Sequence, residues 1–218
     1  MAFLKDTDRD ALRAELQGLA QPVKLILFVD QENCESCDDT RQLLGEVADL
    51  SERITLETYD VNIDPAQAAQ FRIDKAPAIA VMNGKDYGIR YYGIPSGYEF
   101  GSLIDDIIDV SKGESDLQPA TKQALAQLTQ PIHFQVFVTP TCPYCPRAVR
   151  LAHKMAIESD WVRADMIEAT EFPELAEKYE VMAVPRTIIN DASYFEGALP
   201  EAQFLAAALQ TLESDSEN

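Results

Sequence analysis

The sequence of 218 residues has only two histidines, one tryptophan and four cysteines, and it has no long apolar segment. Without an uninterrupted apolar run of about 18 residues, it contains no candidate membrane span. It also lacks a phosphate-binding loop, a histidine cluster for metal and a serine-nucleophile motif. These absences predict a globular protein whose chemistry depends on another residue type.

Basic residues are scarce as well, with 18 Lys and Arg against 37 Asp and Glu, a net charge of −19 and a pI near 4.3. Such a charge opposes contact with nucleic acid and with anionic membranes, so neither is an expected partner. The same charge is equally consistent with a solvated surface. Residues 1–16 alternate acids, bases and leucines, unlike a secretory signal, and we therefore expect a cytoplasmic protein.

The four cysteines form two Cys-x-x-Cys pairs, Cys34 with Cys37 and Cys142 with Cys145. In a reducing compartment, paired cysteines are more often catalytic or metal-binding than structural. Four cysteines could close one zinc site, but 104 residues separate the pairs, far more than in compact zinc modules. The spacing favours dithiol–disulfide chemistry and leaves a zinc scaffold as the weaker alternative.

The two pairs have matching surroundings, because each first cysteine is followed 43 residues later by a proline, Pro77 or Pro185. Segments rich in β-branched and aromatic residues precede both pairs, and apolar residues at helical spacing follow them. The predicted order is α-β-α-β-α-β-β-α, twice. Outside the helices that follow the pairs, helices are expected at 7–19, 65–71, 97–110, 119–128, 173–179 and 200–212. Strands are expected at 23–29, 54–60, 76–82, 132–138, 161–167 and 184–189, with short strands ending near Gly93 and Gly197.

A linker is predicted at 112–117, where periodicity stops and turn residues gather. The chain length also suits two domains of roughly 100 residues. We therefore predict an α/β protein with one unit at 1–115 and a second at 116–218, each a central mixed β-sheet flanked by helices.

On these motifs and their order, each half resembles a thioredoxin-fold unit, and the tandem is similar to the protein disulfide oxidoreductase (glutaredoxin-like) family over nearly the whole chain. The resemblance implies a cis-proline loop facing each disulfide, with cis bonds at Ala76-Pro77 and Val184-Pro185. It also implies recharging by a thioredoxin-reductase-like flavoprotein that uses NADPH. No cofactor is expected beyond the disulfides, and no metal.

The residues themselves indicate how each pair would react. Positions i and i+3 on a helix lie about 5–6 Å apart, within the separation that a disulfide accepts. A helix N-terminus favours thiolate over thiol, which predicts Cys34 and Cys142 as nucleophiles. Cys37 and Cys145, one turn deeper, would resolve the mixed disulfide.

The two sites are expected to differ in charge. Residues 30–41 carry a net charge of −4, whereas residues 139–150 carry only Arg147 and Arg150, a net +2. Negative neighbours disfavour a thiolate and positive neighbours favour it. The sequence therefore predicts that Cys142 has the lower pKa and the more oxidising disulfide.

These features predict an enzyme that reduces, forms or isomerises protein disulfides, chiefly through Cys142 and Cys145. Strand edges beside Pro77 and Pro185 could bind an extended substrate, and Tyr144 could add an apolar contact or serve only as a spacer. Glutathione is disfavoured, because the second unit has Glu196-Gly197-Ala198 where glutaredoxins usually have a Gly-Gly step. The alternatives are an electron-transfer unit for a peroxiredoxin, and a non-catalytic client-binding or zinc scaffold module.

Two other residues carry structural expectations. His153 is predicted on the polar side of a helix, and Trp161 is predicted in the core at the start of a strand. Neither is expected to take part in catalysis.

Overall fold

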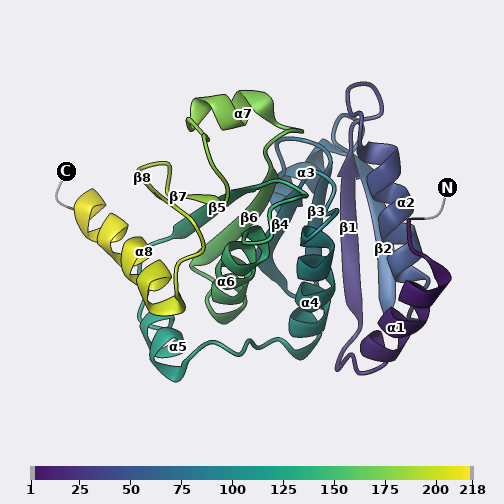
Figure 1. Cartoon of the computed structure of the whole chain (residues 1–218), viewed down its shortest axis with the longest axis horizontal. Helices are drawn as coiled ribbons and strands as arrows, with labels where there is room; N and C mark the ends of the chain where they lie inside the picture. The colour runs from purple at the N-terminus through teal and green to yellow at the C-terminus, as the bar shows by residue number, and fades with distance from the viewer. Residues whose placement is uncertain (1–2, 217–218) are drawn as a thin grey trace.

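The structure, a computed structural model, describes the backbone of residues 3–216 and the side chains of residues 3–213 (Figure 1). The first half contains α1 (Asp6–Leu16), β1 (Val23–Val29), α2 (Cys37–Ala48), β2 (Ile54–Asp60), α3 (Pro65–Phe71), β3 (Ala78–Met82), β4 (Asp86–Tyr92) and α4 (Glu99–Lys112). The second contains α5 (Pro119–Leu125), β5 (Ile132–Val138), α6 (Cys145–Glu158), β6 (Val162–Glu168), α7 (Pro173–Lys178), β7 (Arg186–Ile189), β8 (Ser193–Glu196) and α8 (Glu201–Ser216). This order confirms the predicted repeat.

The eight strands form one sheet, in the order β2-β1-β3-β4-β6-β5-β7-β8. In the first half β1 pairs parallel with β2 and antiparallel with β3, which pairs antiparallel with β4. In the second half β5 pairs in the same way with β6 and β7, and β7 with β8. Each half is therefore a mixed four-stranded sheet, as predicted.

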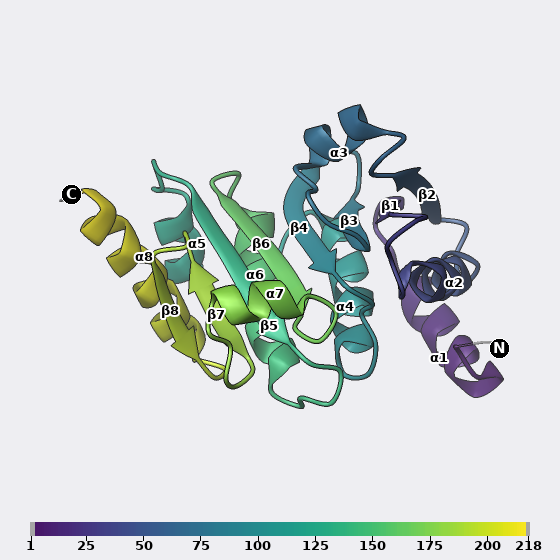
Figure 2. The same ribbon diagram turned by 90° about the horizontal axis from the view of Figure 1, so that it is seen from above.

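The two sheets are joined edge to edge, which the sequence did not predict (Figure 2). Residues Ile89 to Tyr92 of β4 pair parallel with Ala164 to Ile167 of β6. All four of these β4 residues are buried, because another strand and helices on the faces cover them. The join brings each unit into contact with the other near the reactive cysteines.

Helices cover both faces of the joined sheet. One apolar cluster packs α1, α2, α4, α5, α6 and α8 against one face, through residues such as Leu16, Leu44, Ile107, Val149 and Phe204. A smaller cluster packs α3 and α7 against the other face. Because β1 alternates its side chains, Leu25 and Leu27 belong to the first cluster while Ile26 and Phe28 belong to the second.

The pairing directions place β1, β2, β4, β5 and β6 parallel to one another, so their carboxyl ends meet at one edge of the sheet. Both Cys-x-x-Cys pairs follow such strand ends and lie along this edge. The predicted boundary between 115 and 116 falls in the segment between α4 and α5 and stays a prediction. The two predicted units also include residues 1–2 and 217–218, which lie outside the described residues.

Two expectations about single residues were wrong. His153 has no exposed surface, because α6 packs between α4 and the sheet at this position. Trp161 is 47% exposed, because it precedes β6 and is not part of the strand. Within residues 3–216, no helix has the length and apolar character needed to cross a membrane.

Candidate active site

The four cysteines form two disulfides, one within each pair: Cys34 with Cys37 and Cys142 with Cys145. The Cα atoms of the bonded cysteines are 5.5 Å apart in both pairs. This is a usual separation for a disulfide, so each pair can open and close with little backbone movement. Across the described residues, no group of three or more His, Cys, Asp or Glu side chains could hold a metal ion.

Each disulfide bridges a loop to the first turn of a helix. Cys37 begins α2 and Cys145 begins α6, whereas Cys34 and Cys142 lie three residues earlier in the loops that follow β1 and β5. Cys34 and Cys142, which were expected at the N-terminus of a helix, thus lie just before it. The expected spacing is still obtained, because the loop makes a turn there, with the Cys145 N–H donating to the Cys142 carbonyl at 3.4 Å.

The first cysteine of each pair is the more accessible one. Cys142 is 8% exposed and Cys145 is 0% exposed, while Cys34 is half-buried and Cys37 is 4% exposed. An attacking sulfur has to reach its substrate, and a resolving sulfur only has to reach its neighbour. The exposures are consistent with Cys34 and Cys142 as nucleophiles, and these roles remain predictions.

Both proline loops have the geometry that the resemblance implies, since Ala76-Pro77 and Val184-Pro185 are cis. The Val184 carbonyl oxygen lies 3.7 Å from Cys142 Sγ, so the second loop faces its disulfide. Pro77 and Pro185 are buried, and the backbone carbonyl of each accepts a hydrogen bond from the glycine that ends the following hairpin, at 3.0 Å from Gly93 after β4 and 2.8 Å from Gly197 after β8. Their part in substrate binding stays a prediction.

The surface around the second disulfide carries exposed apolar side chains. Tyr144, between the cysteines, is 62% exposed, and Met182, two residues before Val184, is 88% exposed. The corresponding positions at the first disulfide hold the half-buried Ser36 and the exposed Asp74. Sequence reasoning named Tyr144 but missed Met182, whose position becomes informative only once the loop is placed beside Cys142.

A loop of the first unit packs beside the second disulfide. The Tyr98 N–H donates to the carbonyl of Pro140, two residues before Cys142, at 3.1 Å. Gly97 has φ +60, and a Cβ there would overlap the same carbonyl oxygen, so glycine permits this close approach. The two units are therefore in direct contact at the second site.

Glu99 follows this loop as the first residue of α4, and only 1% of it is exposed. Burial raises the pKa of Glu99 to about 7, although the Ser102 hydroxyl donates to its carboxylate at 2.7 Å and opposes the shift. Sequence reasoning missed this group. No local pattern distinguishes it from an exposed glutamate at a helix start, because its burial arises only when the chain has folded.

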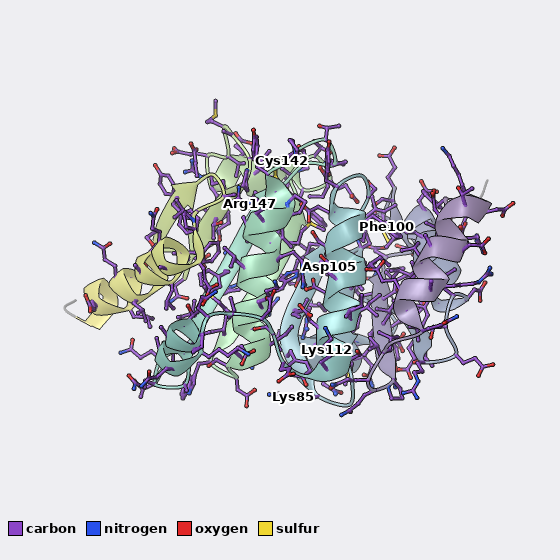
Figure 3. The ribbon with its side chains drawn as sticks, turned by 60° about the horizontal axis from the view of Figure 1, so that its bottom comes forward. Lys85, Phe100, Asp105, Lys112, Cys142 and Arg147 are labelled. Atoms are coloured by element: carbon purple, nitrogen blue, oxygen red, sulfur yellow. A yellow bond between two sulfur atoms is a disulfide. The ribbon has the colours of Figure 1, made fainter. Side chains whose placement is uncertain are left out.

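Helices α4 and α6 lie side by side (Figure 3), and a buried polar network joins them. Arg150 is ion-paired with Asp106 and Asp109, and the His153 Nδ1 lies 2.5 Å from the Asp106 carboxylate. Burial, together with the charge of Arg150, lowers the pKa of His153 to about 3, so this imidazole is neutral. Tyr91 also donates its hydroxyl proton to Asp106.

This network changes the charge balance inferred from the sequence. Arg150 is neutralised by carboxylates of the other unit. Within residues 139–150, Arg147 is then the positive charge that faces solvent. At the first site, Arg41 pairs with Asp38 at 2.6 Å. The difference between the sites therefore comes mainly from the negative charge around the first pair.

Comparison with known proteins agrees with this fold. The model of the thioredoxin domain family matches residues 132–210, which contain the second pair. The crystal structure of a protein disulfide oxidoreductase from Aeropyrum pernix is similar over 94% of this chain and 91% of that chain, with 33% identity and a TM-score of 0.87.

A second group of similar proteins carries the names alkyl hydroperoxide reductase F component and NADH dehydrogenase. A structure of the F component of alkylhydroperoxide reductase from Enterococcus faecalis matches over 94% of this chain and 99% of that chain, with 28% identity and a TM-score of 0.88. By sequence, the F component of alkyl hydroperoxide reductase from Pseudomonas aeruginosa is 26% identical over 89% of this chain, and NADH dehydrogenase of Bacillus subtilis is 24% identical over 89%. The chain spans only 35% and 36% of these two relatives, respectively. The chain belongs to the family of protein disulfide oxidoreductases with two tandem thioredoxin folds, and its two Cys-x-x-Cys pairs place it among the dithiol–disulfide oxidoreductases.

Proposed function

We propose that the chain reduces, forms or isomerises disulfides of protein substrates, chiefly through Cys142 and Cys145 and secondarily through Cys34 and Cys37. The observation that supports this most is the setting of the second disulfide. Cys142 faces the loop of cis-Pro185, with the exposed Tyr144 and Met182 beside it. An extended substrate segment that docks along this loop would find apolar contacts next to the reactive sulfur.

The exchange itself proceeds in two displacements. In the reducing direction, the Cys142 thiolate attacks one sulfur of the substrate disulfide, forms a mixed disulfide and releases the other substrate sulfur as a thiolate. Cys145 then attacks Cys142 Sγ, which closes the Cys142–Cys145 disulfide and releases the second substrate thiolate. The substrate gains two electrons and the pair loses two, and the reverse sequence forms a substrate disulfide.

A reductant has to reopen the pair after each reducing cycle. We propose a thioredoxin-reductase-like flavoprotein using NADPH as the donor and the cytoplasm as the compartment, because a reducing compartment keeps such pairs ready for exchange. Glutathione is the weaker candidate, because Gly197 is followed by Ala198 and not by a second glycine.

A second candidate function is electron transfer to a peroxiredoxin. It is favoured by the similarity to the F components of alkyl hydroperoxide reductases, which covers nearly all of the Enterococcus faecalis chain. Both functions use the same pair and differ in the partner. A coupled assay with NADPH, a thioredoxin reductase and a purified peroxiredoxin would separate them, since only the second function predicts peroxide-dependent NADPH oxidation.

Insulin disulfide reduction tests the main proposal. Cys142→Ser removes the proposed nucleophile, and we expect the rate to fall at least about 100-fold. Cys34→Ser is the matched control at the same position of the first pair, and we expect a loss of less than about threefold because the second pair stays intact. If neither substitution lowered the rate, the catalytic proposal would be wrong. Retained client binding without any activity would favour the client-binding module instead.

A further inference from the structure

The loop that carries the first disulfide is contacted by a carboxylate from the other unit. Glu171 lies between β6 and α7, and its Oε2 accepts a hydrogen bond from the hydroxyl of Ser36, which is enclosed by Cys34 and Cys37. Its Oε1 accepts a second hydrogen bond from the Ile94 N–H at 2.7 Å. Both oxygens are thus held by groups of the first unit.

The backbone around Glu171 is shaped for this contact. Gly93 has φ +92, and a Cβ at that position would lie 2.7 Å from Glu171 Oε1 and 2.6 Å from the Glu168 Cβ. A side chain there would push the carboxylate away from the disulfide loop, so glycine leaves the space that Glu171 uses. Glu171 itself is partly buried, and burial raises the pKa of its carboxyl group.

The second disulfide has a different arrangement at the same position. Tyr144, which takes the place of Ser36, is 62% exposed. The residue that stands 108 positions before Glu171 in the repeat is Ile63, which is 70% exposed. The second unit therefore places a carboxylate at the first pair. The first unit has no carboxylate at the position that matches Glu171.

We propose that Glu171 is a positioning residue for the first pair: it holds the Cys34–Cys37 loop through Ser36 and places one further negative charge beside these sulfurs. Reduction of this disulfide by an external dithiol takes up two electrons and yields two cysteines, each a thiol or a thiolate. A nearby carboxylate disfavours the thiolate, so Glu171 keeps Cys34 protonated and slow to attack. The reactivity of the first pair is then set in part by the second unit.

Other charged groups around this loop act in the same direction. From its own segment they are Asp30, Glu32, Glu35, Asp38 and Asp39, with Arg41 paired to Asp38; from the second unit they are Glu168 and Glu171. Glu171 differs from Glu168 because it accepts a hydrogen bond from the residue between the cysteines. This inference rests on the proposed function in assuming that the first pair exchanges electrons.

The test uses the full chain with Cys142 and Cys145 both changed to Ala, so that only the first pair reacts. After reduction with dithiothreitol, the pKa of Cys34 is read from the pH dependence of its alkylation by iodoacetamide. For Glu171→Gln, which keeps the shape and loses the charge, we expect this pKa to fall by about half a unit and the alkylation rate at pH 7 to rise about threefold. Glu174→Gln, at an exposed position on α7, is the matched control and should change neither value.

Glu171→Asp provides a second variant if Glu171→Gln folds poorly, because it keeps the charge but shortens the reach to Ser36. We expect it to lower the Cys34 pKa by less than Glu171→Gln does. A Cys34 pKa unchanged in both variants would overturn the inference while leaving the proposed function intact. If dithiothreitol failed to open the Cys34–Cys37 disulfide in the parent protein, the proposed exchange at the first pair would itself be wrong.

Discussion

At the first pair the enclosed residue is Ser36, whose hydroxyl is bound to Glu171 of the other unit, whereas at the second pair it is Tyr144, whose side chain stands in solvent. The two sites share the strand, the loop, the helix start and the cis proline. They differ in what the opposite unit brings to them. The repeated backbone therefore supplies the same disulfide chemistry twice, and the contacts between units make the two copies unequal.

The helices that follow the pairs show the same inequality. On α6, Arg150 is largely buried and bound to carboxylates of α4, while on α2, Arg41 is partly exposed and bound to Asp38 of its own helix. Breaking a charge pair buried against another unit is costly, and an exposed pair contributes little. The second disulfide is thus anchored to the first unit, and the next three predictions test that difference.

The largest expected effect is on stability. Arg150→Met would leave the buried Asp106 without its cationic partner, and we expect the free energy of unfolding to fall by about 3 kcal/mol. Arg41→Met removes the exposed pair with Asp38 on α2 and should cost less than about 0.5 kcal/mol. Urea denaturation at pH 7 measures both, and equal losses would show that α6 is not anchored in this way.

The second prediction concerns Glu99, whose pKa is raised to about 7 by burial. A carboxyl group whose pKa is raised on folding stabilises the protein fully below its unfolded pKa, and this contribution is lost as the pH rises towards 7. Glu99→Gln should remove this decline, so that the variant is more stable than the parent at pH 8, by about 3 kcal/mol at most, and similar to it near pH 4.5.

The control for this prediction is Glu201→Gln. Glu201 is the first residue of α8, just as Glu99 is the first residue of α4. Glu201 is only half-buried, and this variant should keep the slope of the parent protein between pH 4.5 and 8. Thermal unfolding at several pH values gives the comparison. A Glu99→Gln protein with the same slope as the parent would mean that Glu99 is not titrated differently in the folded state.

The smallest of the three effects is on substrate binding. Tyr144→Ser places between Cys142 and Cys145 the serine that the first pair has as Ser36. We expect the KM for a protein disulfide substrate to rise about fivefold with little change in kcat, because about 1 kcal/mol of apolar contact is lost. Tyr194→Ser, at a comparably exposed tyrosine on β8, should leave KM unchanged. Equal KM values for all three proteins would support the interpretation of Tyr144 as a spacer.

Much of this fold was predictable because its signals are local. Strands β1, β2 and β5 and helix α3 begin and end at the predicted residues, since apolar runs and helix-starting prolines mark them in the sequence. The cysteine pairs and prolines were found in the same way, by their spacing along the chain. A short-range pattern is enough wherever a residue's partners are close in sequence.

What the sequence could not predict depends on contacts between the halves. The join of β4 to β6 is set by strand edges far apart in the chain, although the run from Ile89 to Tyr92 is compatible with a strand buried on both faces. Glu171 resembles a surface glutamate in the sequence and becomes distinctive only through its contact with Ser36 of the other unit, and nothing in the sequence marks Glu99 as buried. Arg150 was counted as a charge of the second site for the same reason.

We predict that Cys142 is the better nucleophile, because the first pair lies in a more negative environment. The most direct measurement is the thiolate absorbance of two single-pair proteins, one with Cys34 and Cys37 and one with Cys142 and Cys145, followed as a function of pH. We expect the pKa of Cys142 to lie about one unit below that of Cys34. Equal values, or a lower pKa for Cys34, would show that the charges around the two pairs do not make Cys142 the better nucleophile.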